Sequence, residues 1–307
     1  MKIPLIVIAG PTASGKTALS VELALRLDGE IVSADSMQIY KYMNIGTAKP
    51  TPEERCGIPH HMMDFLDPSE NFSAADYCGR AHGIIADISA RGKQAIVVGG
   101  TGLYIDSLIN NVNFGEENVN PKLRRRLFDL AESEGYEAVH KKLAEVDPES
   151  AAKYHPNNIR RIIRALEFYM TTGETISSHA HKEKTSPYDS VYFCINWSRE
   201  ALYERINARV DIMLRDGLEQ EARGFYEKYK GMDLTSMQSI GYKEFFAYFE
   251  GKATLDETTE LIKTRSRQYA KRQMTWFRRN KEIYRLTPGE HMCEEALDVI
   301  SRHFDKN

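Results

Sequence analysis

The stretch that decides the fold reads GPTASGKT over residues 10–17 and directly follows the apolar run Pro4–Ala9. It matches the phosphate-loop pattern G-x-x-x-x-G-K-[ST] in full, and Leu19, Leu23 and Leu27 behind it have the spacing of a helix. Two glycines allow backbone angles that turn successive N–H groups into one concavity, where phosphate oxygens bind. The sequence predicts a cradle of Gly10, Pro11, Thr12, Ala13, Ser14, Gly15, Lys16 and Thr17, in which Lys16 supplies a point charge and the Thr17 hydroxyl a ligand to Mg²⁺.

Further apolar runs outside this loop indicate strands at Glu30–Asp35, Ala95–Val98 and Val191–Asn196. Helical segments separate the runs, which predicts an α/β fold in which a parallel sheet is flanked by helices. In such a sheet the functional residues lie at the C-terminal ends of the strands. After a polar stretch the chain reads as almost continuous helix to about Gly173. We therefore expect a core over residues 1–119, an all-helical insertion over 120–186 and a returning core over 187–307.

The composition is that of an ordinary globular protein. The 307 residues carry 41 basic and 44 acidic side chains, a net charge of −3, and 42% are hydrophobic, which excludes disordered, collagen-like and coiled-coil classes. No apolar run approaches the roughly 18 residues of a membrane span, and none has the form of a signal peptide. The four cysteines lie far apart without metal-site spacing, which predicts reduced thiols and a cytoplasmic protein.

One acidic residue is expected beside the phosphate loop. The strand Ala95–Val98, where an ATPase carries a magnesium-holding acid, ends in Gly99-Gly100-Thr101-Gly102 instead. Asp35 is the only acid that ends a core strand, and it belongs at the same sheet edge as Lys16. From the residues alone Asp35 is either a magnesium ligand or a general base, and the missing strand-end acid favours the base.

Several motifs along nearly the whole chain resemble, in order, those of the tRNA dimethylallyltransferase family. Beside the phosphate loop they are SADSMQIY (33–40), NIGTAKP (44–50), VGGTGLY (98–104), HPNN (155–158) with the arginine helix after it, SIGYKE (239–244), and YAKRQ (269–273) with Trp276. The chain ends without the Cys/His zinc-finger extension of many eukaryotic members, so it resembles the bacterial form.

The resemblance implies transfer of a dimethylallyl group from dimethylallyl diphosphate to the N6 amine of the adenosine just 3′ of the anticodon in tRNA, with release of diphosphate. It implies a P-loop kinase-like core and a helical insertion that grips the anticodon stem-loop. The expected cofactor is Mg²⁺, and the expected partners are tRNA and dimethylallyl diphosphate. We also expect no membrane association and a monomeric enzyme.

Catalytic roles follow from this implied reaction. An exocyclic adenine amine is a poor nucleophile, so a carboxylate that removes its proton during bond formation helps by about a hundredfold or more. We assign this role to Asp35 and expect Thr101 to hydrogen-bond the same amine. Lys16, the loop amides and Arg209 are expected to stabilise the departing diphosphate.

Contacts to tRNA are expected because the target base must leave its stack. Ser36, Met37 and Gln38 follow Asp35 directly and are placed to touch the flipped base, and the resemblance implies further contacts. The predicted set is Asp35, Ser36, Met37, Gln38, Thr101, Arg124, Arg160, Arg161, Ile162, Ile163, Arg164, Ser239, Ile240, Gly241, Tyr242 and Lys243. The stretch Lys263–Lys281 holds eight basic residues and no acidic one, so we expect it to follow phosphates and to make binding sensitive to salt. Trp276 and Phe277 are expected to pack in a helical core.

Two other function classes fit part of the sequence. A P-loop small-molecule kinase would turn over ATP, but the missing strand-end acid and the arginine-rich insertion argue against it. An RNA-binding protein without chemistry of its own would leave Asp35 and Thr101 dispensable.

Overall fold

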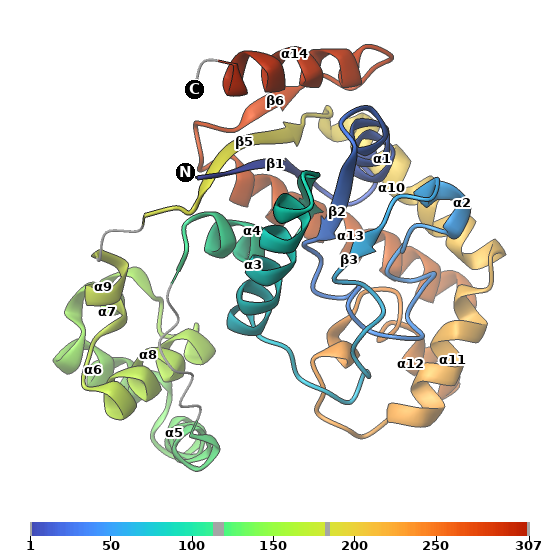
Figure 1. Ribbon diagram of the computed structural model, residues 1–307. Helices are drawn as coiled ribbons and strands as arrows, with labels where there is room; N and C mark the ends of the chain where they lie inside the picture. Colours follow the sequence, from blue (N-terminus) through green and yellow to red (C-terminus); the bar gives the residue numbers. More distant parts are fainter. Residues whose placement is uncertain (1, 113–119, 182–184, 306–307) are drawn as a thin grey trace. The chain divides into compact units, whose positions relative to one another are not determined.

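The computed structural model describes residues 2–112, 120–181 and 185–305 (Figure 1). The chain divides into two compact units, one made of Met1–Val112 and Ser186–Asn307 and the other of Asn113–Thr185. The second unit is thus inserted between two parts of the first. The sequence analysis places the corresponding boundaries after residues 119 and 186.

A six-stranded sheet of parallel strands, in the order β3-β2-β4-β1-β5-β6, forms the centre of the first unit. The central strand β1 pairs with β4 on one side and β5 on the other. Its residues Leu5 to Ala9 are fully buried, as expected for a strand covered on both faces. The predicted strands and the α/β class are confirmed, whereas the short edge strands β3 and β6 were not predicted. The strands are β1 (Ile3–Ala9), β2 (Gly29–Ser33), β3 (His60–His61), β4 (Gln94–Gly99), β5 (Tyr188–Ile195) and β6 (Tyr284–Leu286).

Helices cover both faces of this sheet (Figure 1). Helices α1 (Lys16–Arg26) and α14 (Met292–Phe304) pack together on one face, and their apolar side chains share a core with β1, β4 and β5. On the other face lie α3 (Ala74–Ala90) and α4 (Gly102–Ile109). A capping box at Ser73 starts α3. The four-residue α2 (Pro52–Arg55) lies in the connection between β2 and β3.

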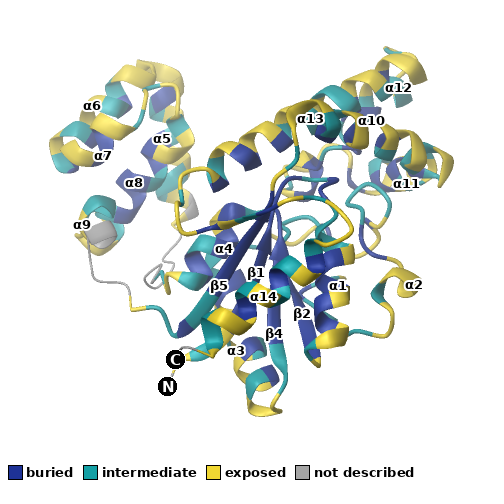
Figure 2. Ribbon diagram, turned by 90° about the horizontal axis from the view of Figure 1, so that it is seen from above, coloured by how far each residue is buried: buried dark blue, intermediate teal, exposed yellow. Residues whose placement is uncertain are grey.

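A further group of helices lies beyond the C-terminal ends of the strands, as Figure 2 shows for α10 and α13. The group consists of α10 (Arg199–Arg215), α11 (Leu218–Tyr229), the 3₁₀ turn Ser236–Gln238, α12 (Phe245–Phe249) and α13 (Leu255–Phe277). Its core includes Tyr40, Tyr242 and Phe245, all completely buried. The segment that follows β2 therefore packs against these helices, and the loops at the strand ends are enclosed on two sides.

The described part of the second unit, residues 120–181 and 185, contains helices and no strand. The helices are α5 (Pro121–Glu134), α6 (Tyr136–Val146), α7 (Pro148–Lys153), α8 (Ile159–Thr172) and α9 (Ile176–His181). The near-continuous helix predicted for this region is interrupted at Gly135, which has a φ of 88°, and at Asp147, whose side chain caps α7. Leu143 and Leu166 belong to its separate core. None of the helices described in either unit combines the length and the apolar character needed to cross a membrane.

Candidate active site

The phosphate loop turns tightly between β1 and α1. Its backbone has positive φ at Gly10 (149°), Ala13 (62°) and Gly15 (94°), and glycine adopts such angles without a steric penalty. Gly15 is the N-cap residue of α1. The N–H groups of the first turn of α1 therefore point into the loop, which is the geometry of an anion site.

Side chains from the C-terminal part of the chain brace this loop from outside. Arg205 Nε and Trp197 Nε1 donate hydrogen bonds of 2.8 and 2.9 Å to the carbonyl oxygens of Ala13–Ser14. The Arg205 guanidinium also lies 4.5 Å from the centroid of the Trp197 ring, a cation–π contact. From α13, Gln273 Oε1 accepts a hydrogen bond of 3.0 Å from the N–H of Thr12. These contacts thus hold the loop conformation from outside the anion site.

Lys16 and Arg209 are among the cationic side chains that line a cavity of about 290 Å³ together with this loop. Lys16 Nζ donates a hydrogen bond of 2.6 Å to the carbonyl oxygen of Pro11. Burial and the nearby Arg209 lower the pKa of Lys16 to about 8, although Asp35 opposes the shift. Burial also lowers the pKa of Arg209, against the influence of Glu54 and Asp35. A bound polyanion relieves this crowding of like charges, so this end of the cavity fits a diphosphate.

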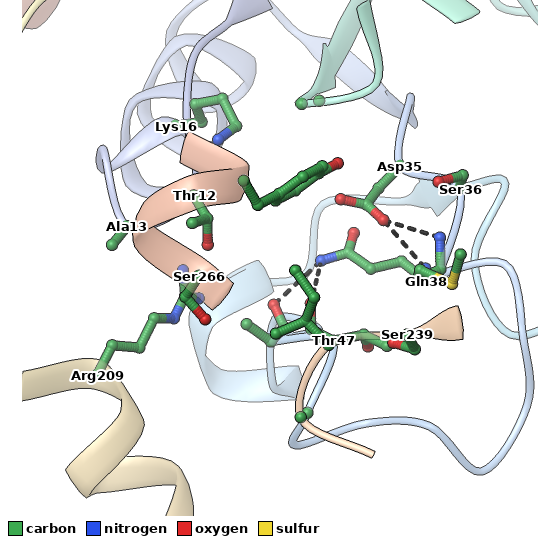
Figure 3. Close-up of a pocket in the computed structure, with 18 of the residues that line it drawn as sticks. Thr12, Ala13, Lys16, Asp35, Ser36, Gln38, Thr47, Arg209, Ser239 and Ser266 are labelled. Carbon is green, nitrogen blue, oxygen red and sulfur yellow. Dashed lines mark hydrogen bonds between the residues drawn. The ribbon is translucent and has the colours of Figure 1, made fainter. Parts of the chain in front are cut away.

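Asp35 follows β2 and lines the same cavity (Figure 3). Its Oδ1 accepts hydrogen bonds from the N–H groups of Met37 (2.9 Å) and Gln38 (3.3 Å), which fixes the direction of the carboxylate. Thr101 Oγ1 accepts a hydrogen bond of 3.1 Å from the N–H of Ser36. Among the described residues, the cavity lining includes Ser36 but not Thr101, so Thr101 is joined to the cavity wall through the residue next to Asp35.

Gln38 is held in place by its own side-chain amide. Its Nε2 donates hydrogen bonds of 3.1 Å to the carbonyl oxygens of Thr47 and Ala48, as Figure 3 shows, and its Oε1 accepts one from Ser33 Oγ. The N–H groups of residues 44–46 donate in turn to the carboxylate of Glu221. This network makes the segment after Asp35 a fixed wall of the cavity.

The predicted stretch 239–243 also reaches the cavity, with one exception. Ser239, Ile240, Gly241 and Lys243 line it, whereas Tyr242 is completely buried. The Tyr242 hydroxyl donates a hydrogen bond of 2.5 Å to Glu221, and its ring occupies the space beside Gly46, where any β-carbon would overlap it. The Tyr242 side chain is therefore engaged in packing and in the hydrogen bond to Glu221, and the predicted contact of this residue with tRNA stays a prediction.

In the second unit, two predicted RNA contacts share one acidic partner. Arg124 Nη2 donates a hydrogen bond of 2.6 Å to Glu167, and Arg164 Nη1 lies 3.5 Å from the same oxygen. Glu167 is completely buried, whereas both arginine side chains are about one third exposed. Part of each guanidinium group is thus bound to the protein, and both side chains remain partly exposed.

Helix α8 separates the remaining predicted contacts into two groups. Arg160 and Arg161 are exposed, as a contact to RNA requires. Ile162 and Ile163 are fully buried in the core of the second unit. Their side chains are used for packing on the apolar face of the helix, so a contact of these two residues with tRNA would have to come from the backbone, and it stays a prediction.

The basic stretch on α13 is less available than its composition indicates. Lys263 forms ion pairs with Asp211 (2.9 Å), from the neighbouring α10, and with Glu260 (3.1 Å), one turn earlier. Arg267 donates a hydrogen bond of 2.6 Å to Asn207, also on α10. These two members of the predicted phosphate-following stripe therefore bind the helix to its neighbour.

Helix α13 contributes residues that the sequence analysis does not place in the cavity. Tyr269, Arg272 and Gln273 line the cavity. Burial raises the pKa of the Tyr269 hydroxyl, which remains neutral at physiological pH. These three residues belong to the motif YAKRQ (269–273), which is the feature of the sequence that could have indicated their place in the site. Trp276 packs as predicted and donates a hydrogen bond of 2.7 Å to Asp106.

Comparisons with known proteins agree with this geometry. A family model described as IPP transferase matches residues 38–280. A tRNA dimethylallyltransferase of Bacillus cytotoxicus is 50% identical, with 94% of this chain and 92% of the relative covered, and one of Bacillus subtilis is 49% identical, with 98% and 96% covered.

Solved structures give the same result. A tRNA isopentenylpyrophosphate transferase from Bacillus halodurans has a TM-score of 0.75 at 43% identity, covering 99% of this chain and 98% of that one. A eukaryotic dimethylallyltransferase described as acting on tRNA has a TM-score of 0.87 at 36% identity, covering 99% and 80%. These matches favour the transferase over the kinase, and they show that the chain belongs to the IPP transferase family, the tRNA dimethylallyltransferases.

Proposed function

We propose that this transferase uses the cavity at the ends of β1, β2 and β4 to move a dimethylallyl group from dimethylallyl diphosphate to the N6 amine of the tRNA adenosine just 3′ of the anticodon. The observation that carries this proposal is that cationic groups and a carboxylate line one cavity. The cations of Lys16 and Arg209 and the carboxylate of Asp35 line the same space. A leaving diphosphate and an attacking amine need these two kinds of group side by side.

In the proposed reaction the amine nitrogen attacks the first carbon of the dimethylallyl group. The C–N bond forms as the bond from that carbon to the diphosphate oxygen breaks, and Asp35 takes the proton that the amine loses. The hydrogen bonds from Met37 and Gln38 to Oδ1 hold the carboxylate in one direction. Lys16, Arg209 and the loop N–H groups stabilise the negative charge on the departing diphosphate.

Mg²⁺ is the proposed cofactor, with Thr17 as the protein ligand. Thr17 lines the cavity beside Lys16 at the start of α1. Because Mg²⁺ keeps several waters and binds readily to substrate phosphates, one hydroxyl and the diphosphate oxygens suit its chemistry. When bound, the ion would neutralise charge on the diphosphate.

The RNA contacts that we propose use both units. At the cavity, Ser36 and Met37 lie next to Asp35 and are positioned to touch the extruded base or its neighbours. In the second unit, Arg160 and Arg161 present exposed guanidinium groups suited to the phosphates of the anticodon stem. We further propose that the enzyme acts on tRNA as a monomer in the cytoplasm.

The test is transfer of label. The protein is incubated with unmodified tRNA and labelled dimethylallyl diphosphate, with Mg²⁺ or with EDTA, and in a parallel tube with labelled ATP and no prenyl donor. We expect label in the adenosine 3′ of the anticodon, only in the tube that contains Mg²⁺ and the prenyl donor. Label that moves from ATP to a small molecule would refute the proposal in favour of a kinase. A chain that binds tRNA without transfer would be a binding protein.

A further inference from the structure

The side chain of Gln273, on α13, joins two loops that carry different parts of the site. Its Oε1 accepts a hydrogen bond of 3.0 Å from the N–H of Thr12, in the phosphate loop. Its Nε2 donates a hydrogen bond of 3.0 Å to the carbonyl oxygen of Gly100, in the loop after β4. Gln273 is about 5% exposed, and the bond to Gly100 is buried while the bond from Thr12 is partly buried.

The two loops approach each other closely around this amide. A β-carbon on Gly100 would overlap Gln273 Nε2, and the next nearest atoms are Gln273 Cδ at 3.4 Å and Gly10 O, also from the phosphate loop, at 3.5 Å. Gly100 precedes Thr101, whose N–H donates to the carbonyl oxygen of Ala34 at 3.1 Å. The Gln273 amide therefore lies between the loop that holds the phosphates and the segment attached to Asp35.

Gln273 also decides which N–H groups of the phosphate loop face the ligand. The Thr12 N–H is bound to Gln273 and is unavailable to a phosphate oxygen. The backbone N–H groups open to a phosphate oxygen consequently follow Thr12, from the positive-φ turn of Ala13 onward, whereas Thr12 itself still lines the cavity.

We propose that Gln273 is a positioning residue, which sets the distance between the bound diphosphate and the attacking amine by bonding both loops at once. This inference rests on the proposed function. In an in-line displacement the reacting atoms must lie about 3–3.5 Å apart, and a misplacement of about 1 Å costs about a hundredfold in rate. Loss of the amide should therefore slow the chemical step, while each substrate still binds to its own loop.

The first test is Gln273→Met, which keeps the side-chain length and removes both hydrogen bonds. With tRNA and dimethylallyl diphosphate saturating, we expect the single-turnover rate to fall about 10- to 100-fold. The dissociation constants of both substrates should change less than about threefold. Gln268→Met is the matched control, because Gln268 is an exposed glutamine on the same helix whose side chain accepts a hydrogen bond from Arg265, and it should transfer at the unaltered rate.

A second test gives an answer even if Gln273→Met does not fold. Gly100→Ala inserts a methyl group against the Gln273 amide, whereas Gln273→Ala removes the amide and the overlap with it. We expect Gly100→Ala to slow transfer about tenfold or more in the unaltered protein and by less than twofold in the Gln273→Ala background.

Three results would overturn the inference. One is a Gln273→Met rate within twofold of the unaltered protein. Another is a loss of activity that matches the loss of folded protein or the weaker binding of a substrate. The third is an equal effect of Gly100→Ala in both backgrounds. If the unaltered protein itself transfers no label, it is the proposed function that fails.

Discussion

The lowered pKa of Lys16 predicts how the affinity for the prenyl donor depends on pH. Burial first, and Arg209 second, bring this pKa to about 8, so the ammonium group begins to lose its proton within an accessible range. Only the protonated form attracts the diphosphate. Affinity should therefore be constant well below pH 8 and should weaken as the pH rises through 8.

The size of the effect follows from the fraction of Lys16 that is protonated in the free protein. Relative to its low-pH limit, the dissociation constant of dimethylallyl diphosphate should rise about twofold at pH 8 and about elevenfold at pH 9. The rise should end where the affinity reaches that of Lys16→Met, which has no charge to lose. Lys16→Arg keeps its proton throughout this range and should show no such dependence.

Calorimetric titration at fixed Mg²⁺ and ionic strength, between pH 6.5 and 9.5, measures this profile. Leaving out tRNA prevents transfer, so the donor binds without being consumed. Circular dichroism at each pH checks that the protein stays folded. A dissociation constant that does not change between pH 7 and 9 would refute the reasoning, and so would the same rise in Lys16→Met.

The other predictions concern the base, the strand packing and the RNA contact. Asp35→Asn should reduce the single-turnover transfer rate at least about a hundredfold and leave tRNA affinity, measured by filter binding, within about threefold; unchanged transfer would remove Asp35 as the base. Gly99→Ala should lower the free energy of unfolding in urea by about 2–3 kcal/mol, because its β-carbon overlaps the backbone after β2, which cannot move aside. Gly79→Ala, on the open side of α3, should instead be neutral or stabilising, and equal losses would contradict this account. Arg161→Ala should reduce the slope of log affinity for tRNA against log salt by about 1, whereas Arg125→Ala, an exposed arginine on α5, should leave it unaltered; two equal slopes would exclude the Arg161 contact.

The parts of the site that could be predicted from sequence are those encoded locally. The phosphate loop is a contiguous motif, and Asp35 directly follows an apolar strand. A general rule of parallel sheets then places both at one edge without further information. The structure has Lys16 and Asp35 lining the same cavity, in agreement with that rule.

Ion pairs between side chains that lie far apart in the sequence could not be predicted from it. Glu167 is 43 residues from Arg124, and nothing local indicates that one buried carboxylate binds two arginines. Lys263 likewise meets Asp211 from another helix. A count of charges along the chain treats such side chains as available to RNA, because it contains no information on tertiary ion pairs.

Two predicted RNA contacts coincide with a packing signal in the same residues. Ile162 and Ile163 lie on the apolar face of an amphipathic helix, and the periodicity alone indicated burial. The resemblance placed them among the RNA contacts instead. The strands β3 and β6 have two and three residues, too few for alternation or an apolar run to be recognised.

The order of strands in the sheet has a consequence for synthesis on the ribosome. Strand β1 pairs with β4 on one side and with β5 on the other, and β5 follows the whole helical insertion. At about 5–20 residues per second, one edge of this fully apolar strand waits on the order of ten to forty seconds for its partner. The insertion, whose contacts are local, can fold during that time. The nascent N-terminal half therefore has an open, aggregation-prone edge until β5 is synthesised. This interval is the stage at which a chaperone would bind the chain.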